Sequence, residues 1–192
     1  MPLNFPNLLT WARILTIPLI LGIYYFPDTW LLPATKNMAG AILFMLAGIT
    51  DWFDGYLARK WNQLSAFGAF LDPVADKLMV AAALILLVQL GRAEAWLAAI
   101  IIGREITISA LREWMAQLGN SKSVAVSFVG KVKTAAQMVA ITVLLFHENV
   151  IHGVDMQLIG SVCLLVAAVL TLWSMGYYLR VAWPQLSDRQ KS

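Results

Sequence analysis

The chain has 192 residues, of which 60% are hydrophobic and only 13% are charged, and its formal net charge is +3. A soluble domain carries roughly 25% charged residues and about half apolar ones, so this composition excludes an ordinary soluble enzyme or a basic nucleic-acid-binding domain. The mean hydropathy of +0.71 agrees, and the apolar residues fall into blocks near the ~20 residues that a helix needs to cross a bilayer. We therefore predict an all-α, polytopic membrane protein.

Six candidate transmembrane helices follow one another along the chain. They are expected over residues 8–26, 37–60, 69–90, 94–117, 126–147 and 155–180. Each connection contains polar or helix-breaking residues, such as Pro27 and Pro33 in the first and Gly91 in the third. No repeat or low-complexity tract interrupts the sequence, which is interpreted as a single domain over residues 1–192.

Basic residues predict the orientation of these spans. With a cytoplasmic N-terminus, the even-numbered connections and the C-terminal end lie in the cytoplasm, and only Lys36 and Arg92 lie near the other side. The cytoplasmic basic residues are then Arg59, Lys60, Arg112, Lys122, Lys131, Lys133, Arg180, Arg189 and Lys191. This asymmetry fits the positive-inside rule, so both termini are expected in the cytoplasm.

Four aspartates lie at the ends of the second and third expected spans. Asp51 and Asp54 are three residues apart, and Asp72 and Asp76 are four apart, so each pair shares one face of a helix. The short turn between the two spans makes them antiparallel neighbours, which brings the pairs together. Charges beside a bilayer are costly and mark function. Two divalent cations would remove the repulsion, and oxygen ligands suit Mg²⁺ or Mn²⁺.

Three neighbouring residues support a phosphate-binding role for this region. Gly55 follows Asp54, and Gly68 precedes Asp72 by one turn, so a ligand or a facing helix can approach closely at both positions. Arg59 lies about one turn beyond Asp54, and a guanidinium beside bound metals suits a pyrophosphate. An ion or proton transporter is the alternative class, but its acidic residues would be spread through the depth of the membrane.

The segment from Asp51 to Asp76 resembles the signature of the CDP-alcohol phosphotransferase family. That signature is D-x2-D-G-x2-A-R-x8-G-x3-D-x3-D, and Asp51, Asp54, Gly55, Ala58, Arg59, Gly68, Asp72 and Asp76 match all of its fixed positions. The resemblance implies two metals, with Asp51 and Asp72 contacting both, Asp54 completing one site and Asp76 the other. It further implies that Asp76 accepts the proton of the acceptor hydroxyl, and a homodimer is expected at the family level.

The same resemblance implies a site for CDP-diacylglycerol, the phosphatidyl donor. Its expected residues are Asn7, Thr10, Gly55, Ala58, Arg59, Ser65 and Gly68. Three further stretches, residues 7–13, 104–114 and 130–134, are similar to the branch of the family that uses glycerol 3-phosphate. Their cations Arg104, Arg112, Lys131 and Lys133 are predicted to bind the phosphate of the acceptor, because a dianion needs several charged donors.

The expected reaction is the transfer of the phosphatidyl group of CDP-diacylglycerol to glycerol 3-phosphate, which gives phosphatidylglycerophosphate and CMP. The acceptor hydroxyl attacks directly, and Asp76 is the base. The motif lies at the expected cytoplasmic ends of the spans, which is the depth of the bond that is cleaved. Inositol phosphate, serine or phosphatidylglycerol remain alternative acceptors for the same chemistry.

Overall fold

The structure is a computed structural model, and it describes residues 5–60, 66–117, 128–148 and 154–189. Every regular element among these residues is an α-helix. The helices are α1 (Phe5–Tyr25), α2 (Pro33–Lys60), α3 (Ala66–Gln89), α4 (Ala95–Gln117), α5 (Phe128–Phe146) and α6 (Met156–Arg189). The all-α class and the six helices that the sequence predicts are therefore confirmed.

Local chemistry sets several helix ends. Helix α2 begins at Pro33, where proline's missing N–H is no loss in the first turn. Helix α3 ends at Gln89, and the turn that follows contains Gly91, whose φ of 69° lies in the left-handed region that favours glycine. Arg92 N donates to Leu87 O across this turn. Asp155 caps α6 by accepting hydrogen bonds from the backbone N–H groups of Gln157 and Leu158 at 2.9 and 3.2 Å.

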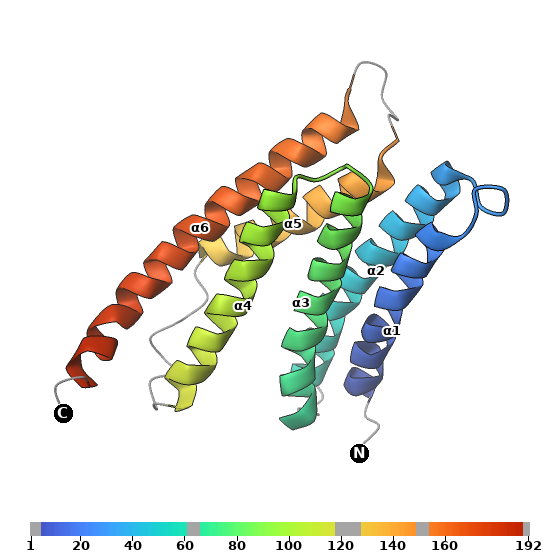
Figure 1. The fold of residues 1–192 in the computed structure, drawn as a ribbon. Coiled ribbons are helices and arrows are strands. Elements are labelled where there is room, and N and C mark those ends of the chain that lie inside the picture. The colour runs from blue at the N-terminus through green and yellow to red at the C-terminus, as the bar shows by residue number, and fades with distance from the viewer. Residues whose placement is uncertain (1–4, 61–65, 118–127, 149–153, 190–192) are drawn as a thin grey trace.

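The helices form a bundle in which both termini lie at one end and the α1–α2 and α3–α4 connections lie at the other (Figure 1). Its core is apolar and contains residues from all six helices, among which Phe44, Leu87 and Leu144 are completely buried. Helices α5 and α6 approach closely at Gly160, where a Cβ atom would lie only 2.6 Å from the Leu144 side chain. Small residues at such contacts are typical of helix packing in membranes.

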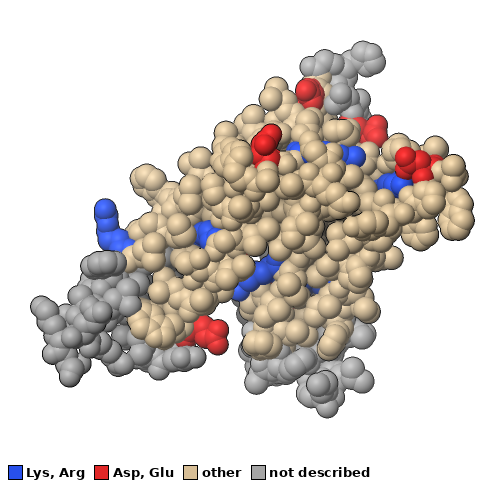
Figure 2. All heavy atoms as spheres, viewed as in Figure 1, with Lys and Arg blue, Asp and Glu red and all other residues tan. Residues whose placement is uncertain are grey.

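The outer surface of the bundle is also apolar. Leu15, Ile85 and Leu158 are 60–67% exposed, and most of the face shown in Figure 2 carries no charged side chain. Residues 156–177 of α6 are the one stretch of the described chain long and apolar enough by themselves to cross a membrane. Helix α4, in contrast, carries Arg104 and Glu105 near its middle. The six spans therefore remain a prediction, whereas the six helices are observed.

A polar network ties the helices together at the end opposite the termini. Arg92 donates to the carbonyl oxygens of Leu144 and Leu145, at 3.3 and 3.0 Å, and to Asn37 Oδ1 at 2.7 Å. Gln157 Nε2 donates to the carbonyl oxygen of Arg92 at 2.9 Å. Burial lowers the pKa of Arg92 from its ordinary value. This far-end network fixes the starts of α2 and α6 against the end of α5.

Candidate active site

Three of the four predicted aspartates have described side chains, and α1 brings two of them together. Arg13 of α1 places Nη1 3.0 Å from Asp51 Oδ1 on α2 and 2.8 Å from Asp76 Oδ1 on α3. One guanidinium nitrogen thus joins carboxylates from two different helices. The predicted antiparallel turn between α2 and α3 is not the only means of bringing them together, because α1 packs against both helices.

Thr10 holds the third aspartate from the same face of α1. Its hydroxyl donates to Asp72 Oδ1, and it lies three residues before Arg13, so the two side chains share one helical face. Thr10 and Arg13 are each 1% exposed. A buried polar face of α1 therefore organises Asp51, Asp72 and Asp76, which together with Thr10 and Arg13 are called the aspartate cluster below.

The aspartate cluster has the chemistry of a site for hard divalent cations. The Arg13 side chain is fully buried, whereas those of Asp51 and Asp76 are 41% and 39% exposed, so their carboxylates remain open to a ligand. Carboxylate oxygens suit Mg²⁺ or Mn²⁺. Among the side chains that the structure describes, no three acidic, histidine or cysteine residues form a ready metal site. The side chain of Asp54, the fourth predicted ligand, lies outside the described residues.

Other predicted site residues also lie outside the described part of the chain, wholly or in their side chains. Ser65 is outside it altogether, and the side chains of Asn7, Ala58, Arg59, Arg112 and Lys131 are not described, although these five positions lie in helices. Gly55 lies in α2, and Gly68 is buried near the start of α3, one turn before Asp72. Their roles remain predictions from the sequence.

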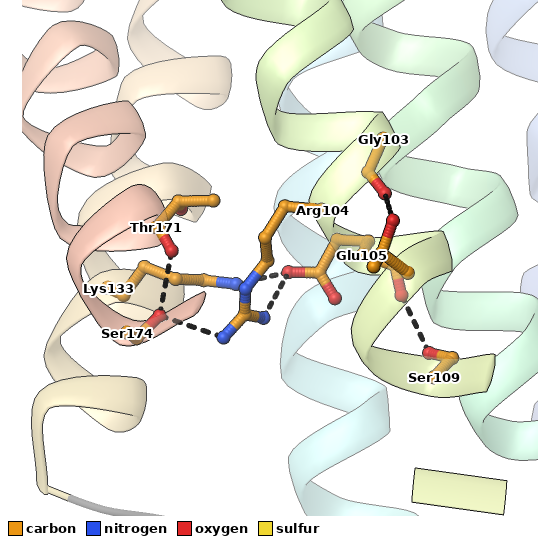
Figure 3. Close-up of polar contacts among 8 residues, drawn as sticks. Gly103, Arg104, Glu105, Ser109, Lys133, Thr171 and Ser174 are labelled. Carbon is orange, nitrogen blue, oxygen red and sulfur yellow. Dashed lines mark hydrogen bonds and ion pairs between the residues drawn. The ribbon is translucent and has the colours of Figure 1, made fainter. Parts of the chain in front are cut away.

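A second polar cluster joins α4, α5 and α6 (Figure 3). Glu105 Oε1 accepts from Lys133 Nζ and from Arg104 Nη1, the latter at 3.3 Å. Arg104 Nη2 donates to Ser174 Oγ at 2.8 Å, and Ser174 donates to the carbonyl oxygen of Thr171 at 2.9 Å. Arg104 and Lys133 are only 6% and 3% exposed. Two predicted phosphate-binding cations therefore lie together, both in contact with one carboxylate.

A cavity of about 210 Å³ connects the two clusters. Its lining residues are Pro73, Asp76, Lys77 and Val80 from α3, Glu105 from α4, and Thr134 and Gln137 from α5. A water molecule takes ≈ 30 Å³ of liquid volume, so the cavity has room for a small polar ligand. It places Asp76, the predicted base, and Glu105 on the walls of one space.

Arg13 and Glu105 are not among the site residues that the sequence predicts. Both are charged residues within long apolar helices, and this is the signal that could have revealed them, because charges at such positions are costly unless they are paired or functional. Arg13 is the last residue of the stretch 7–13 that resembles the family, and no local pattern assigns it a function. The identity of its partners depends on how α1 packs against α2 and α3, which no local pattern encodes.

Comparisons with known proteins agree with the aspartate motif. Residues 3–173 match the family model described as CDP-alcohol phosphatidyltransferase. The chain is 50% identical, over 98% of its length, to proteins of Escherichia coli (strain K12) and Shigella flexneri serotype 5b (strain 8401). The match covers 100% of each relative, and both carry the name CDP-diacylglycerol--glycerol-3-phosphate 3-phosphatidyltransferase.

Proposed function

The chain belongs to the CDP-alcohol phosphatidyltransferase family, and we propose that it transfers the phosphatidyl group of CDP-diacylglycerol to glycerol 3-phosphate. The products are phosphatidylglycerophosphate and CMP, and the pathway is phospholipid biosynthesis. One observation carries this conclusion: half of all residues are identical, over nearly the whole chain, to relatives named for this activity. The alternative acceptors that the motif alone leaves open are thereby set aside.

The aspartate cluster carries the metal-dependent part of the reaction. Four aspartates would hold two divalent cations, Mg²⁺ or Mn²⁺: Asp51 and Asp72 would serve both sites, Asp54 one of them and Asp76 the other. These ions, when bound, offset the charge of the pyrophosphate and of the leaving CMP. The convergence of Asp51 and Asp76 on Arg13, with Asp72 held by Thr10, supports this assignment.

Asp76 accepts the proton of the attacking hydroxyl. Its carboxylate belongs to the aspartate cluster and also lines the 210 Å³ cavity. An acceptor bound in that cavity would therefore have its hydroxyl beside Asp76 and close to the phosphate that is attacked. Arg13 positions this carboxylate by an ion pair at 2.8 Å. Because phosphoryl-type transfer depends mainly on positioning and charge, a buried arginine that orients two aspartates contributes directly to it.

The lipid donor lies along α2. Asn7, Thr10, Gly55, Ala58, Arg59, Ser65 and Gly68 bind its CDP head and the adjoining phosphates. An apolar cavity of about 420 Å³, lined by residues including Gly48, Ile49 and Met138 from α2 and α5, begins one helical turn from Asp51. An acyl chain has the apolar character that this lining requires. Because the cavity lies along α2, a chain bound in it would extend from the aspartate cluster into the bilayer.

The acceptor phosphate binds to Arg104, Arg112, Lys131 and Lys133. The clustering of Arg104 and Lys133 beside the cavity supports this role.

The six helices cross the bacterial inner membrane as one domain, and the aspartate cluster faces the cytoplasm, where glycerol 3-phosphate is dissolved. The excess of basic residues at that end supports the orientation.

A direct test uses the purified protein in detergent with CDP-diacylglycerol, Mg²⁺ and a panel of acceptors. We expect CMP release with glycerol 3-phosphate and little with inositol phosphate, serine or phosphatidylglycerol. Release that is equal for all acceptors, or that requires one of the other three, would contradict the proposed function. A transporter would release no CMP with any acceptor.

A further inference from the structure

The carboxylate of Glu105 has one oxygen engaged by cations and one oxygen available. Both Lys133 and Arg104 contact Oε1. Among the residues that the structure describes, Oε2 has no hydrogen-bond or ion-pair partner (Figure 3). The Glu105 side chain is 23% exposed and lines the cavity that it shares with Asp76. The carboxylate is thus held at one oxygen, and its side chain lines the cavity.

The charge state of Glu105 restricts what it can bind there. Two cations on Oε1 favour the ionised form, and an ionised carboxylate is only an acceptor of hydrogen bonds. A phosphate placed directly against Oε2 would be repelled. A hydroxyl group, in contrast, would donate a strong charge-assisted hydrogen bond. Of the groups that glycerol 3-phosphate carries, the one that fits Glu105 is therefore a hydroxyl.

The order of groups along the site matches the order of groups along the acceptor. In glycerol 3-phosphate, the first carbon carries the attacking hydroxyl, the second carries another hydroxyl, and the third carries the phosphate. In the protein, Asp76 lines the cavity on α3 and Glu105 lines it on α4, while Lys133 and Arg104 contact Glu105 without lining the cavity themselves. Glu105 thus shares the cavity with the predicted base and contacts both of the predicted phosphate-binding cations.

We propose that Glu105 binds the middle hydroxyl of glycerol 3-phosphate and so selects a glycerol phosphate over a simple hydroxyalkyl phosphate. This inference rests on the proposed function. Lys133 and Arg104 then have two tasks: they bind the acceptor phosphate, and they hold the Glu105 carboxylate in place beside it. Asp76 and Glu105 together fix the orientation of the glycerol, because they bind adjacent hydroxyls.

The test compares two acceptors with the same enzyme preparation. The analogue 3-hydroxypropyl phosphate keeps the attacking hydroxyl and the phosphate but lacks the middle hydroxyl. With saturating CDP-diacylglycerol and Mg²⁺, kcat/KM is measured for each acceptor by CMP release. The ratio of the two values does not depend on the fraction of protein that is folded. The wild type should prefer glycerol 3-phosphate by roughly ten- to a hundredfold, the range for a hydrogen bond to a charged group.

Glu105→Met keeps the length of the side chain but removes both oxygens, so the preference should fall to near unity. Since this change leaves buried cations without their carboxylate, Glu105→Asp serves as a second variant that keeps the charge but withdraws it from the hydroxyl. It should lower the preference severalfold. Glu94→Met, at an exposed position just before α4, is the matched control and should keep the wild-type ratio.

Several results would overturn the proposal. A wild type that uses both acceptors equally, or an active Glu105 variant with the wild-type ratio, would reduce Glu105 to a counter-ion of Lys133 and Arg104. Failure of the proposed function looks different, because the wild type would then release no CMP with glycerol 3-phosphate. If Arg104 does not bind the acceptor phosphate, Arg104→Ala will leave the KM for glycerol 3-phosphate unchanged, whatever ratio of kcat/KM values the Glu105 variants show.

Discussion

Two arginines hold the two ends of the bundle, and they do so with different partners. Arg13 contacts the carboxylates of Asp51 and Asp76, which remain about 40% exposed. Arg92 contacts backbone carbonyls at the end of α5 and the side-chain oxygen of Asn37. Carboxylates that face the outside can exchange partners when a charged ligand arrives, whereas helix carbonyls cannot. The first end is therefore suited to chemistry, and the second to holding the helices in register.

The largest expected effect lies in the aspartate cluster. Asp72→Asn should abolish nearly all CMP release, because an amide cannot supply the charge that two cations require, while the protein stays folded in detergent. Asp28→Asn is the matched control at the far end, where the Asp28 side chain is 72% exposed and pairs with Lys36. Near-wild-type turnover by Asp72→Asn would remove this residue from the metal site.

A smaller effect is expected at the acceptor cations. Arg104→Ala should raise the KM for glycerol 3-phosphate about ten- to a hundredfold, since a charge-assisted hydrogen bond contributes roughly 1.5–3 kcal/mol. The KM for CDP-diacylglycerol should change far less. Arg104→Lys should restore only part of the loss, because an ammonium cannot make the forked contact of a guanidinium. A selective rise in the KM for CDP-diacylglycerol would instead assign Arg104 to the donor site.

Arg13 should affect both turnover and the metal requirement. Arg13→Met removes the common partner of Asp51 and Asp76, and we expect kcat to fall by about tenfold, because only part of the cost of breaking a buried pair applies to half-exposed carboxylates. It also removes a positive charge from the proposed metal site, so the Mg²⁺ concentration for half-maximal activity should decrease. An unchanged Mg²⁺ requirement would mean that Arg13 has only a structural role.

The smallest effect on activity is expected at the far end. Arg92→Met leaves the carbonyls of Leu144 and Leu145 and the Asn37 side chain without their donor, which should cost about 1–3 kcal/mol of stability. A thermal unfolding scan in detergent should show a Tm lowered by several degrees. The acceptor and donor KM values should stay at those of the wild type. A loss of turnover without a loss of stability would erase the distinction between the two ends.

The sequence predicts the six helices because each is a long apolar block bounded by polar residues. Helix ends are less well predicted. Helix α6 continues to Arg189, beyond the expected residue 180, because a helix can extend past the apolar block that predicts it. Helix α2 begins at Pro33 instead of residue 37, since proline starts a helix well although hydropathy does not mark it.

The candidate site is predictable only where a local pattern encodes it. The spacing of Asp51, Asp72 and Asp76 predicts that they lie close together on neighbouring helices, and their role as metal ligands stays a prediction. Their contacts with Thr10 and Arg13 arise from residues about 40 to 60 positions away in sequence, and no periodicity indicates them. The available oxygen of Glu105 likewise depends on three helices packing together. Tertiary contacts of this kind require the structure.

We propose that the aspartates gathered by α1 bind the two cations on which transfer depends. Equilibrium binding of Mn²⁺ to the purified protein tests it most directly, with CDP-diacylglycerol present and without turnover. We predict two bound ions per chain in the wild type and in Asp28→Asn, and fewer than two in Asp72→Asn. Two ions bound with wild-type affinity by folded Asp72→Asn would contradict the claim.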